Sequence, residues 1–302
     1  MKKIITLLIF GSVMFPALSQ DEPVKEISNI QEYTPSKLLK KGQWDIKFFN
    51  SLYTQTKRTD EGSYSIDIPR ETFFTNTTEI YTGISKNSRI NIGFIFQVRS
   101  NVFGGSDALD VFKFEDNLNA RSGLTTIAPS VRVQPFVKIP NFSITSSVYI
   151  PIFEDKAALP YLDKRSVFWE TKFFYDKTFG NDKWQLFTEV DLGFNFGEKS
   201  SEANPINSNV SERFANNSLF LPLSAFISYF PSSKTTVFAN VKQAFLIDLG
   251  NNFGQNSTSL GFGGKYQLSK VLNLEASFDQ FVRGNNFQGL GQTYSLGLRV
   301  IF

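Results

Sequence analysis

From about residue 43 to the end of the chain, apolar and polar side chains alternate with a period of two. In the segment 89–99 one face is apolar, with Ile95 as an exception on the other: the apolar positions are Ile90, Ile92, Phe94, Phe96 and Val98. Successive side chains of a β-strand point to opposite faces, so this alternation predicts strands. No segment beyond the N-terminus is apolar for long enough to predict a transmembrane helix. A chain of this kind that crosses a membrane must therefore use strands that close on themselves.

The alternation predicts about twelve strands separated by connections of two kinds. The predicted spans are 43–56, 72–85, 89–99, 125–138, 142–152, 166–177, 183–196, 218–230, 235–248, 258–268, 271–282 and 292–302. Short connections alternate with long ones near 57–71, 100–124, 153–165, 197–217, 249–257 and 283–291. Short periplasmic turns and long extracellular loops are typical of outer-membrane barrels. We therefore predict an all-β fold: a transmembrane antiparallel β-barrel in up-and-down meander order.

The N-terminus has the pattern of a secretion signal. Two lysines are followed by a short apolar run over 4–15, and the small residues Ala17 and Ser19 precede an expected cleavage near Gln20. The run is too short to span a membrane comfortably, which argues against an anchor helix. The predicted organisation is a signal peptide over 1–19, a short periplasmic segment over 20–42 and an outer-membrane barrel over 43–302. The segment 20–42 is expected to be either a flexible tail or an ordered plug.

Aromatic residues gather at one predicted rim of the barrel. The lipid-facing positions at the periplasmic end include Trp44, Phe142, Tyr175, Trp184, Tyr229, Tyr266 and Phe302. Amphipathic rings prefer the membrane interface, so this set predicts an aromatic girdle. A secreted β-sandwich would also alternate, but its outward face would be polar and it would need no girdle.

The end of the chain resembles the terminal strand of Gram-negative outer-membrane β-barrels. It combines a final aromatic residue with alternating apolar ones: Tyr294, Leu296, Leu298, Val300 and Phe302. In that family the barrel-assembly machinery reads such a terminal strand. The resemblance implies this machinery as a partner during biogenesis and outer-membrane lipid as the surroundings. It points to a twelve-stranded type without identifying a subfamily.

Composition narrows the chemistry. The chain has no Cys and no His, which excludes disulfides and thiol nucleophiles and removes the usual general base and the usual zinc ligands. Outer-membrane phospholipases and proteases of barrel form use a His, so the resemblance implies no enzyme of those kinds. If two of the 31 basic residues leave with the signal peptide, 29 remain against 28 acidic ones, which predicts no nucleic-acid partner. We predict no enzymatic activity, no cofactor and no metal site.

The alternation also predicts which side chains of each strand face the barrel interior, and the charged ones among them are the candidate residues that line the barrel. They are Lys47, Arg99, Arg132, Glu170, Lys172, Glu189, Asp191, Lys242, Lys265, Glu275, Asp279 and Arg299, and Asp45 and Glu79 share the same parity. Because inward acids and bases balance, no strong ion selectivity is expected. Two interpretations stay open: charged walls that orient a polar solute, or an ion-pair network that fills and stiffens the barrel.

Inward aromatic residues leave a similar choice. They are Phe49, Tyr53, Tyr149, Phe174, Phe187, Phe220, Phe226, Phe238 and Phe281, and they either line a solute path or pack the interior. Pro135 and Pro222, both predicted inside strands, indicate bends in the wall. The first functional hypothesis is a channel or transporter for small solutes. The second is a non-conducting structural or interaction barrel whose extracellular loops bind a partner. The loops 100–124 and 197–217 are the expected contact or gating elements.

Overall fold

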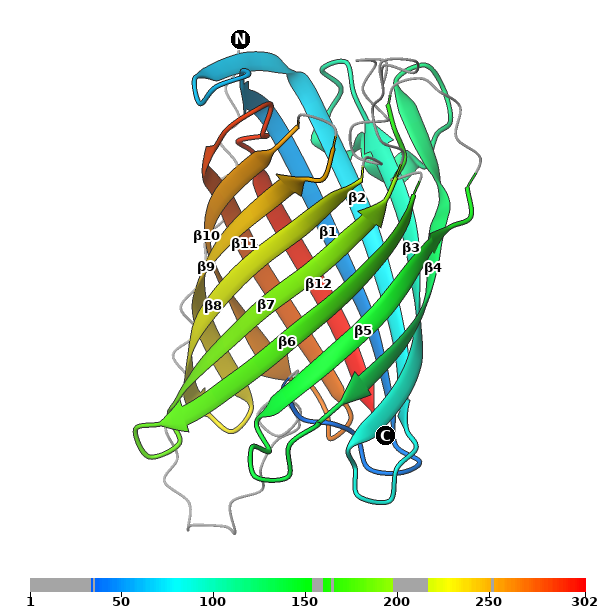
Figure 1. Ribbon diagram of the computed structural model, residues 1–302. Helices are drawn as coiled ribbons and strands as arrows, with labels where there is room; N and C mark the ends of the chain where they lie inside the picture. The colour runs from blue at the N-terminus through cyan, green and yellow to red at the C-terminus, as the bar shows by residue number, and fades with distance from the viewer. Residues whose placement is uncertain (1–33, 35, 154–159, 164–165, 198–216, 251–252) are drawn as a thin grey trace.

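The computed structural model describes residues 34, 36–153, 160–163, 166–197, 217–250 and 253–302. Twelve strands form one closed antiparallel barrel, in which each strand pairs with its neighbours in sequence and the last pairs with the first (Figure 1). The strands are β1 (Trp44–Thr59), β2 (Ser65–Gly83), β3 (Ile90–Val102), β4 (Ala120–Val133), β5 (Phe142–Pro151), β6 (Val167–Phe179), β7 (Trp184–Phe196), β8 (Ser218–Ser232), β9 (Thr235–Asp248), β10 (Gln255–Gln267), β11 (Leu272–Gly284) and β12 (Gln292–Ile301). One 3₁₀-helix, η1 (Ala108–Lys113), lies between β3 and β4. The predicted fold class is confirmed.

The first and last strands close the barrel along their length. Their register runs from Asp45 opposite Ile301 to Thr54 opposite Gln292. Trp44 and Phe302 extend the ladder by exchanging two backbone hydrogen bonds of 2.8 and 3.0 Å. Closure leaves no sheet edge whose unpaired N–H and C=O groups would face lipid, where each would cost several kcal/mol.

The two ends of the barrel differ. The C-terminus lies at one end, which we call the turn end, and the three longest connections, 103–119, 152–166 and 197–217, lie at the other, the loop end (Figure 1). Aromatic side chains exposed on the outer face mark the turn end, among them Trp44, Trp184, Tyr266 and Phe302. The rings of Trp184 and Tyr229 lie 4.8 Å apart on neighbouring strands. Within the described residues, no helix has the length and hydropathy needed to cross a membrane.

The prediction of a long loop at 57–71 is wrong. Strands β1 and β2 stay paired beyond a bulge between Gln55 and Lys57, so that only residues 60–64 connect them. The Asp60 carboxylate closes this turn by accepting hydrogen bonds from the backbone N–H groups of Gly62 and Tyr64 at 2.8 and 3.2 Å. Charged residues and a proline made the segment look like a loop, but its side chains still alternate.

Two smaller corrections concern β4. The strand begins at Ala120 and ends at Val133, so the loop before it covers 103–119 instead of 100–124. Pro135 therefore lies in the turn after β4 and bends no strand, whereas Pro222 does lie within β8, opposite Ala244 of β9. Proline lacks the N–H that a strand ladder needs, which is consistent with β4 ending before Pro135. The signal peptide 1–19 and most of the loop 197–217 lie outside the described residues.

Candidate functional site

The interior of the barrel at the turn end holds a network of charged side chains. Asp45 accepts two hydrogen bonds from the Arg299 guanidinium, from Nε at 2.8 Å and from an Nη at 2.7 Å. Arg132 contacts Asp45 at 3.5 Å and Glu79 at 2.8 Å. These residues come from β1, β2, β4 and β12, so the network ties together both sides of the barrel closure. The Asp45 carboxylate is 3% exposed, which means that its charge is balanced by protein groups more than by water.

Tyr81 packs this network from β2. The Arg132 guanidinium lies 3.4 Å from the centre of the Tyr81 ring, in the geometry of a cation–π contact. The Tyr81 hydroxyl donates to the Ser130 hydroxyl at 2.7 Å. The ring is fully buried, and it packs with Leu39 and Ile301 in a small apolar cluster.

A second network surrounds Lys172 on β6. Its ammonium group contacts the carboxylates of Glu170, Glu189 and Asp191 at 3.5, 3.4 and 3.2 Å. Tyr149 donates its hydroxyl hydrogen to Glu170 at 3.1 Å. One cation therefore faces three carboxylates, so the net charge of this part of the wall is negative.

Two simpler pairs lie on the next part of the wall. Lys242 of β9 contacts Asp279 of β11 at 2.8 Å, across the intervening strand β10. Lys265 of β10 contacts Glu275 of β11 at 3.2 Å. The candidate basic residues thus lie beside candidate acidic ones, an arrangement that favours the ion-pair interpretation over separate acidic and basic walls.

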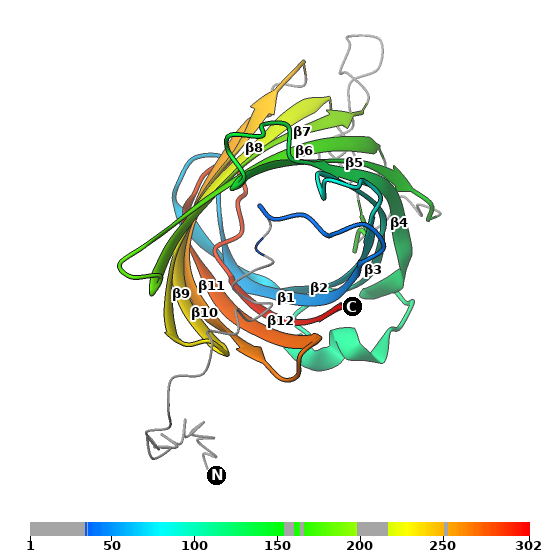
Figure 2. The same ribbon diagram turned by 90° about the horizontal axis from the view of Figure 1, so that it is seen from below.

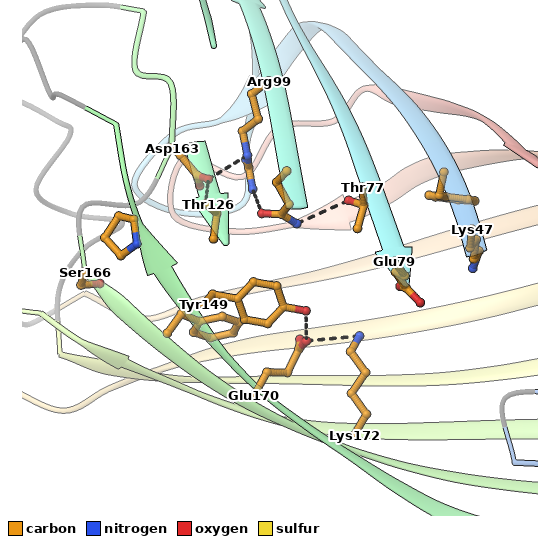
Figure 3. A pocket seen from close by; sticks show the side chains of 14 residues that line it. Lys47, Thr77, Glu79, Arg99, Thr126, Tyr149, Asp163, Ser166, Glu170 and Lys172 are labelled. Atoms are coloured by element: carbon orange, nitrogen blue, oxygen red, sulfur yellow. Dashed lines mark hydrogen bonds and ion pairs between the residues drawn. The ribbon is translucent and has the colours of Figure 1, made fainter. Parts of the chain in front are cut away.

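A polar cavity of about 380 Å³ lies in the barrel interior, and Figure 3 shows the side chains that line it. It extends from Glu79 and Lys172 of these networks to Ser166, which precedes β6 at the loop end. Its walls include Lys47, Tyr149, Glu170 and Lys172, together with Asp163 from the connection between β5 and β6. The Asp163 carboxylate contacts Arg99 at 3.0 Å and accepts a hydrogen bond from the Thr126 hydroxyl at 2.8 Å, as Figure 3 shows.

This connection is held against the barrel wall by its backbone as well. The Asn101 amide donates to the carbonyl oxygens of Tyr161 and Leu162. Leu162 is buried, and the Tyr161 ring lies 6.3 Å from that of Phe103. The described part of the connection therefore narrows the loop end of the barrel.

Lys47 differs from the other candidate cations. Within the described part of the chain it makes no ion pair, and its ammonium group lies 5.0 Å from the centre of the Phe49 ring. Glu79 on β2 and Arg299 on β12 stand opposite it in the strand register. Lys47 is thus a charged group at the cavity wall that can meet a solute without first losing a salt bridge.

A second cavity, also about 380 Å³, lies on the side formed by β7 to β11. Phe220, Pro222, Leu246 and Phe281 give it an apolar wall, and Lys242 is its one charged lining residue. Toward the turn end the rings of Phe174, Phe187, Phe226 and Phe238 follow one another with centroids 5.6 to 5.8 Å apart. These inward aromatics pack against each other as a row across four strands.

The described residues before β1 cross the turn end of the barrel. We call Thr34 and Ser36–Gly42 the N-terminal strap. Figure 2 shows it running across the opening from the side of β6 toward β2. Its hydroxyl groups at Thr34 and Ser36 donate to the Asp176 carboxylate of β6.

The strap is fixed at its other end by β2 and β3. The Leu39 backbone exchanges two hydrogen bonds with the Asn91 side chain, at 3.0 and 3.2 Å, and Leu39 is 2% exposed. Lys41 then pairs in parallel with Gly83. A Cβ at Gly83 would lie 2.1 Å from a strap carbonyl oxygen, so only glycine allows this approach. The described part of the segment 20–42 is therefore an ordered strap rather than a free tail.

The structure brings ten of the twelve candidate residues into ion-pair groups, whereas Arg99 pairs with Asp163 and Lys47 makes no ion pair within the described residues. Asp163 lies in a connection without alternation, and its role depends on how that connection folds inward. Asp176 is one of the acidic residues that the alternation places on the inward face, and Asn91 shares that face, but nothing in the sequence indicated that the strap would bind them. The terminal residues Tyr294, Leu296, Leu298 and Phe302 are all exposed on the outer face.

No protein-family model and no curated protein sequence matches this chain. Solved structures do. An outer membrane channel from Pseudomonas putida F1 is 11% identical, with a TM-score of 0.66 over 88% of this chain and 98% of the other. The β-domain of the Bordetella autotransporter BrkA is 13% identical, with a TM-score of 0.56 over 86% of this chain and 99% of the other. The chain has the fold of the Gram-negative outer-membrane β-barrels. At sequence identities of 11% and 13%, the similarity to these two structures shows the fold alone.

Proposed function

We propose that this barrel is an outer-membrane channel for small polar solutes. The observation that carries the proposal is the polar cavity of about 380 Å³ inside the wall, lined by Lys47, Thr77, Gln97 and Tyr149. Twelve strands enclose more space than an eight-stranded barrel, whose interior side chains fill. The fold is shared with a protein described as an outer membrane channel, which supports the same role here.

The proposal includes an orientation and a setting. The turn end faces the periplasm and the loop end faces outward, as the short and long connections of outer-membrane barrels do. The signal peptide is removed near Gln20, the barrel-assembly machinery inserts the chain, and outer-membrane lipid surrounds the apolar face. Because most lumenal charges are paired, the channel is expected to discriminate by size and polarity more than by charge.

We expect the narrowest part of the path at the turn end, where the strap crosses the opening and Asp45 pairs with Arg132 and Arg299. The Lys172 network and Lys242 line the two cavities, which extend toward the loop end. A solute entering from outside would meet the polar cavity first and then the layer that contains Arg132, Arg299 and the strap. Passage requires this layer to open, so a low conductance follows from the proposal.

Liposome swelling tests the proposal. Liposomes that contain the folded barrel should swell in small sugars or amino acids, and the rate should fall as the solute grows. Tyr149→Ala removes a ring from the wall of the polar cavity and should raise the rate several-fold. The matched control is Phe94→Ala, because Phe94 is 54% exposed on the outer face and lines neither of the two interior cavities.

A second function is favoured by one observation: the ordered strap covers the turn end. On this alternative the barrel does not conduct, and its loops bind a partner outside the cell. Folded protein that gives no swelling, as wild type and as Tyr149→Ala, would contradict the channel and favour this alternative.

A further inference from the structure

The connection between β3 and β4 does not cover the barrel mouth but folds down over the outside of the wall. Figure 2 shows this segment, which contains η1, outside the ring of strands. Phe74 points outward from β2 and is nevertheless only 7% exposed, because η1 packs over it. The Phe112 ring lies 5.1 Å from the Phe74 ring, and Val111 is fully buried beneath the helix.

The helix η1 has three distinct faces, because a 3₁₀-helix has three residues per turn and places residues i and i+3 above one another. Val111 faces the barrel. Asp110 and Lys113 form an ion pair of 2.9 Å on the face toward solvent. Leu109 and Phe112 form the third face and remain 65% and 50% exposed. Two large apolar side chains thus point sideways along the barrel wall.

That third face borders a groove of about 660 Å³ on the outside of the barrel. The opposite side of the groove is formed by Tyr294 and Leu296 of β12, and its floor by Leu52 of β1. At the end nearest the loops lies Arg70, half-buried, with one Nη donating to the Thr54 hydroxyl at 3.1 Å. A guanidinium has five N–H donors, so this hydrogen bond leaves capacity for an anion.

The depth of the groove in the membrane follows from the strand geometry. Leu52 lies eight residues along β1 from the girdle residue Trp44, or about 26 Å at about 3.3 Å per residue. With a strand tilt of about 40°, this is about 20 Å above the girdle, in the upper part of an apolar band about 25 Å tall. Arg70 lies further up β2 and therefore at the level of the lipid headgroups, where an outward-facing cation costs little.

We propose that this groove binds a phosphorylated, acylated glycolipid of the outer leaflet, the lipid A type. An acyl chain would lie between Leu109, Phe112 and Leu296, and a phosphate would accept hydrogen bonds from Arg70. The inference rests on the orientation given under the proposed function but not on conduction. The nearby acids do not oppose it: Asp110 is paired with Lys113, and Asp107 accepts a hydrogen bond from the Leu109 backbone N–H at 2.9 Å.

Native mass spectrometry of the folded full chain in detergent tests the proposal, with bisphosphorylated lipid A as the probe. Wild type should bind lipid A, and Arg70→Gln should lower the affinity about tenfold, since hydrogen bonds to charged groups are among the stronger ones. Lys57→Gln is the control, because Lys57 is an exposed cation at the same end that does not line the groove. Its affinity should equal that of wild type.

Further arms separate the possible occupants. Dephosphorylated lipid A should bind with the same affinity to wild type and to Arg70→Gln. Phe112→Ser should lower the affinity for both lipid A and dephosphorylated lipid A. Equal lipid A affinity in wild type, Arg70→Gln and Phe112→Ser would overturn the proposal. So would a change from dimer to monomer in Phe112→Ser without any change in lipid binding, because the groove would then be an interface between two copies. The heat-dependent shift in electrophoretic mobility verifies that each variant is folded.

Discussion

Lys172 is the point at which removal of one cation should have the largest effect on the barrel interior. Its ammonium group faces the carboxylates of Glu170, Glu189 and Asp191 within 3.5 Å, and no other described cation contacts these three. Lys172→Met keeps a side chain of similar length and removes the charge. Three carboxylates would then face each other across β6 and β7 without a cation, and only Glu170 would keep a described hydrogen-bond donor, the Tyr149 hydroxyl.

The expected loss of stability follows from the burial of these charges. Removing one partner of a buried ion pair costs about 3–5 kcal/mol, since the other charge stays buried. The Lys172 side chain is 29% exposed, so water relieves part of this cost and we expect a loss of about 3 kcal/mol in the free energy of unfolding. The direction of ion selectivity follows from the same charges: the variant should prefer cations more than wild type does.

Unfolding in urea, followed by tryptophan fluorescence and by the heat-dependent mobility shift, measures the first effect. The reversal potential in a salt gradient measures the second. Lys172→Arg should restore much of both, because it keeps the charge. Lys234→Met, at an exposed turn, should change neither. If Lys172→Met were as stable as Lys234→Met, the three contacts would not be balancing buried charge, and the reasoning would be refuted.

Three further predictions follow from closure, orientation and the strap. Deletion of Phe302, or Leu298→Asp on the lipid-facing side of the closing strand, should lower the yield of assembled barrel in the outer membrane, measured by the heat-dependent mobility shift. The aspartate should lower the stability of the folded barrel by up to about 2 kcal/mol. An unchanged yield in both variants would contradict the closing role of this strand. A tag within 103–119 should be labelled on intact cells and a tag at the 233–234 turn should not, whereas labelling of the turn would reverse the orientation. Gly83→Val should displace the strap, because the strap backbone leaves no room for a side chain at position 83. Trypsin should then cut after the lysines of the strap faster than in wild type. Equal cleavage rates would show that the strap does not pack against β2.

The sequence predicted the parts of this fold that repeat. Period-two alternation located all twelve strands, most within three residues of their observed ends, because each strand has one face toward lipid and one toward the interior. The same parity selected charged residues that the structure brings into contact, such as Lys265 with Glu275. At 57–71, where the side chains alternate but charged residues and a proline are typical of a loop, the lengths of β1 and β2 were underestimated.

Features that depend on non-repeating segments could not be predicted. Asp163 reaches Arg99 only because its connection folds inward, and η1 covers Phe74 only because its connection folds outward. The strap is held by hydrogen bonds to side chains of distant strands, such as Asn91 and Asp176. Such contacts leave no periodic pattern in the sequence, so they appear only when the barrel positions both partners.

Single-channel recording tests the central claim most directly. The folded full chain in a planar bilayer should give discrete, low-conductance steps with weak ion selectivity. Asn91→Ala with Asp176→Ala, which removes two of the side chains that bind the strap, should increase the conductance or the open fraction. Silent bilayers from heat-shifting, folded protein, with wild type and with this double variant alike, would contradict the channel.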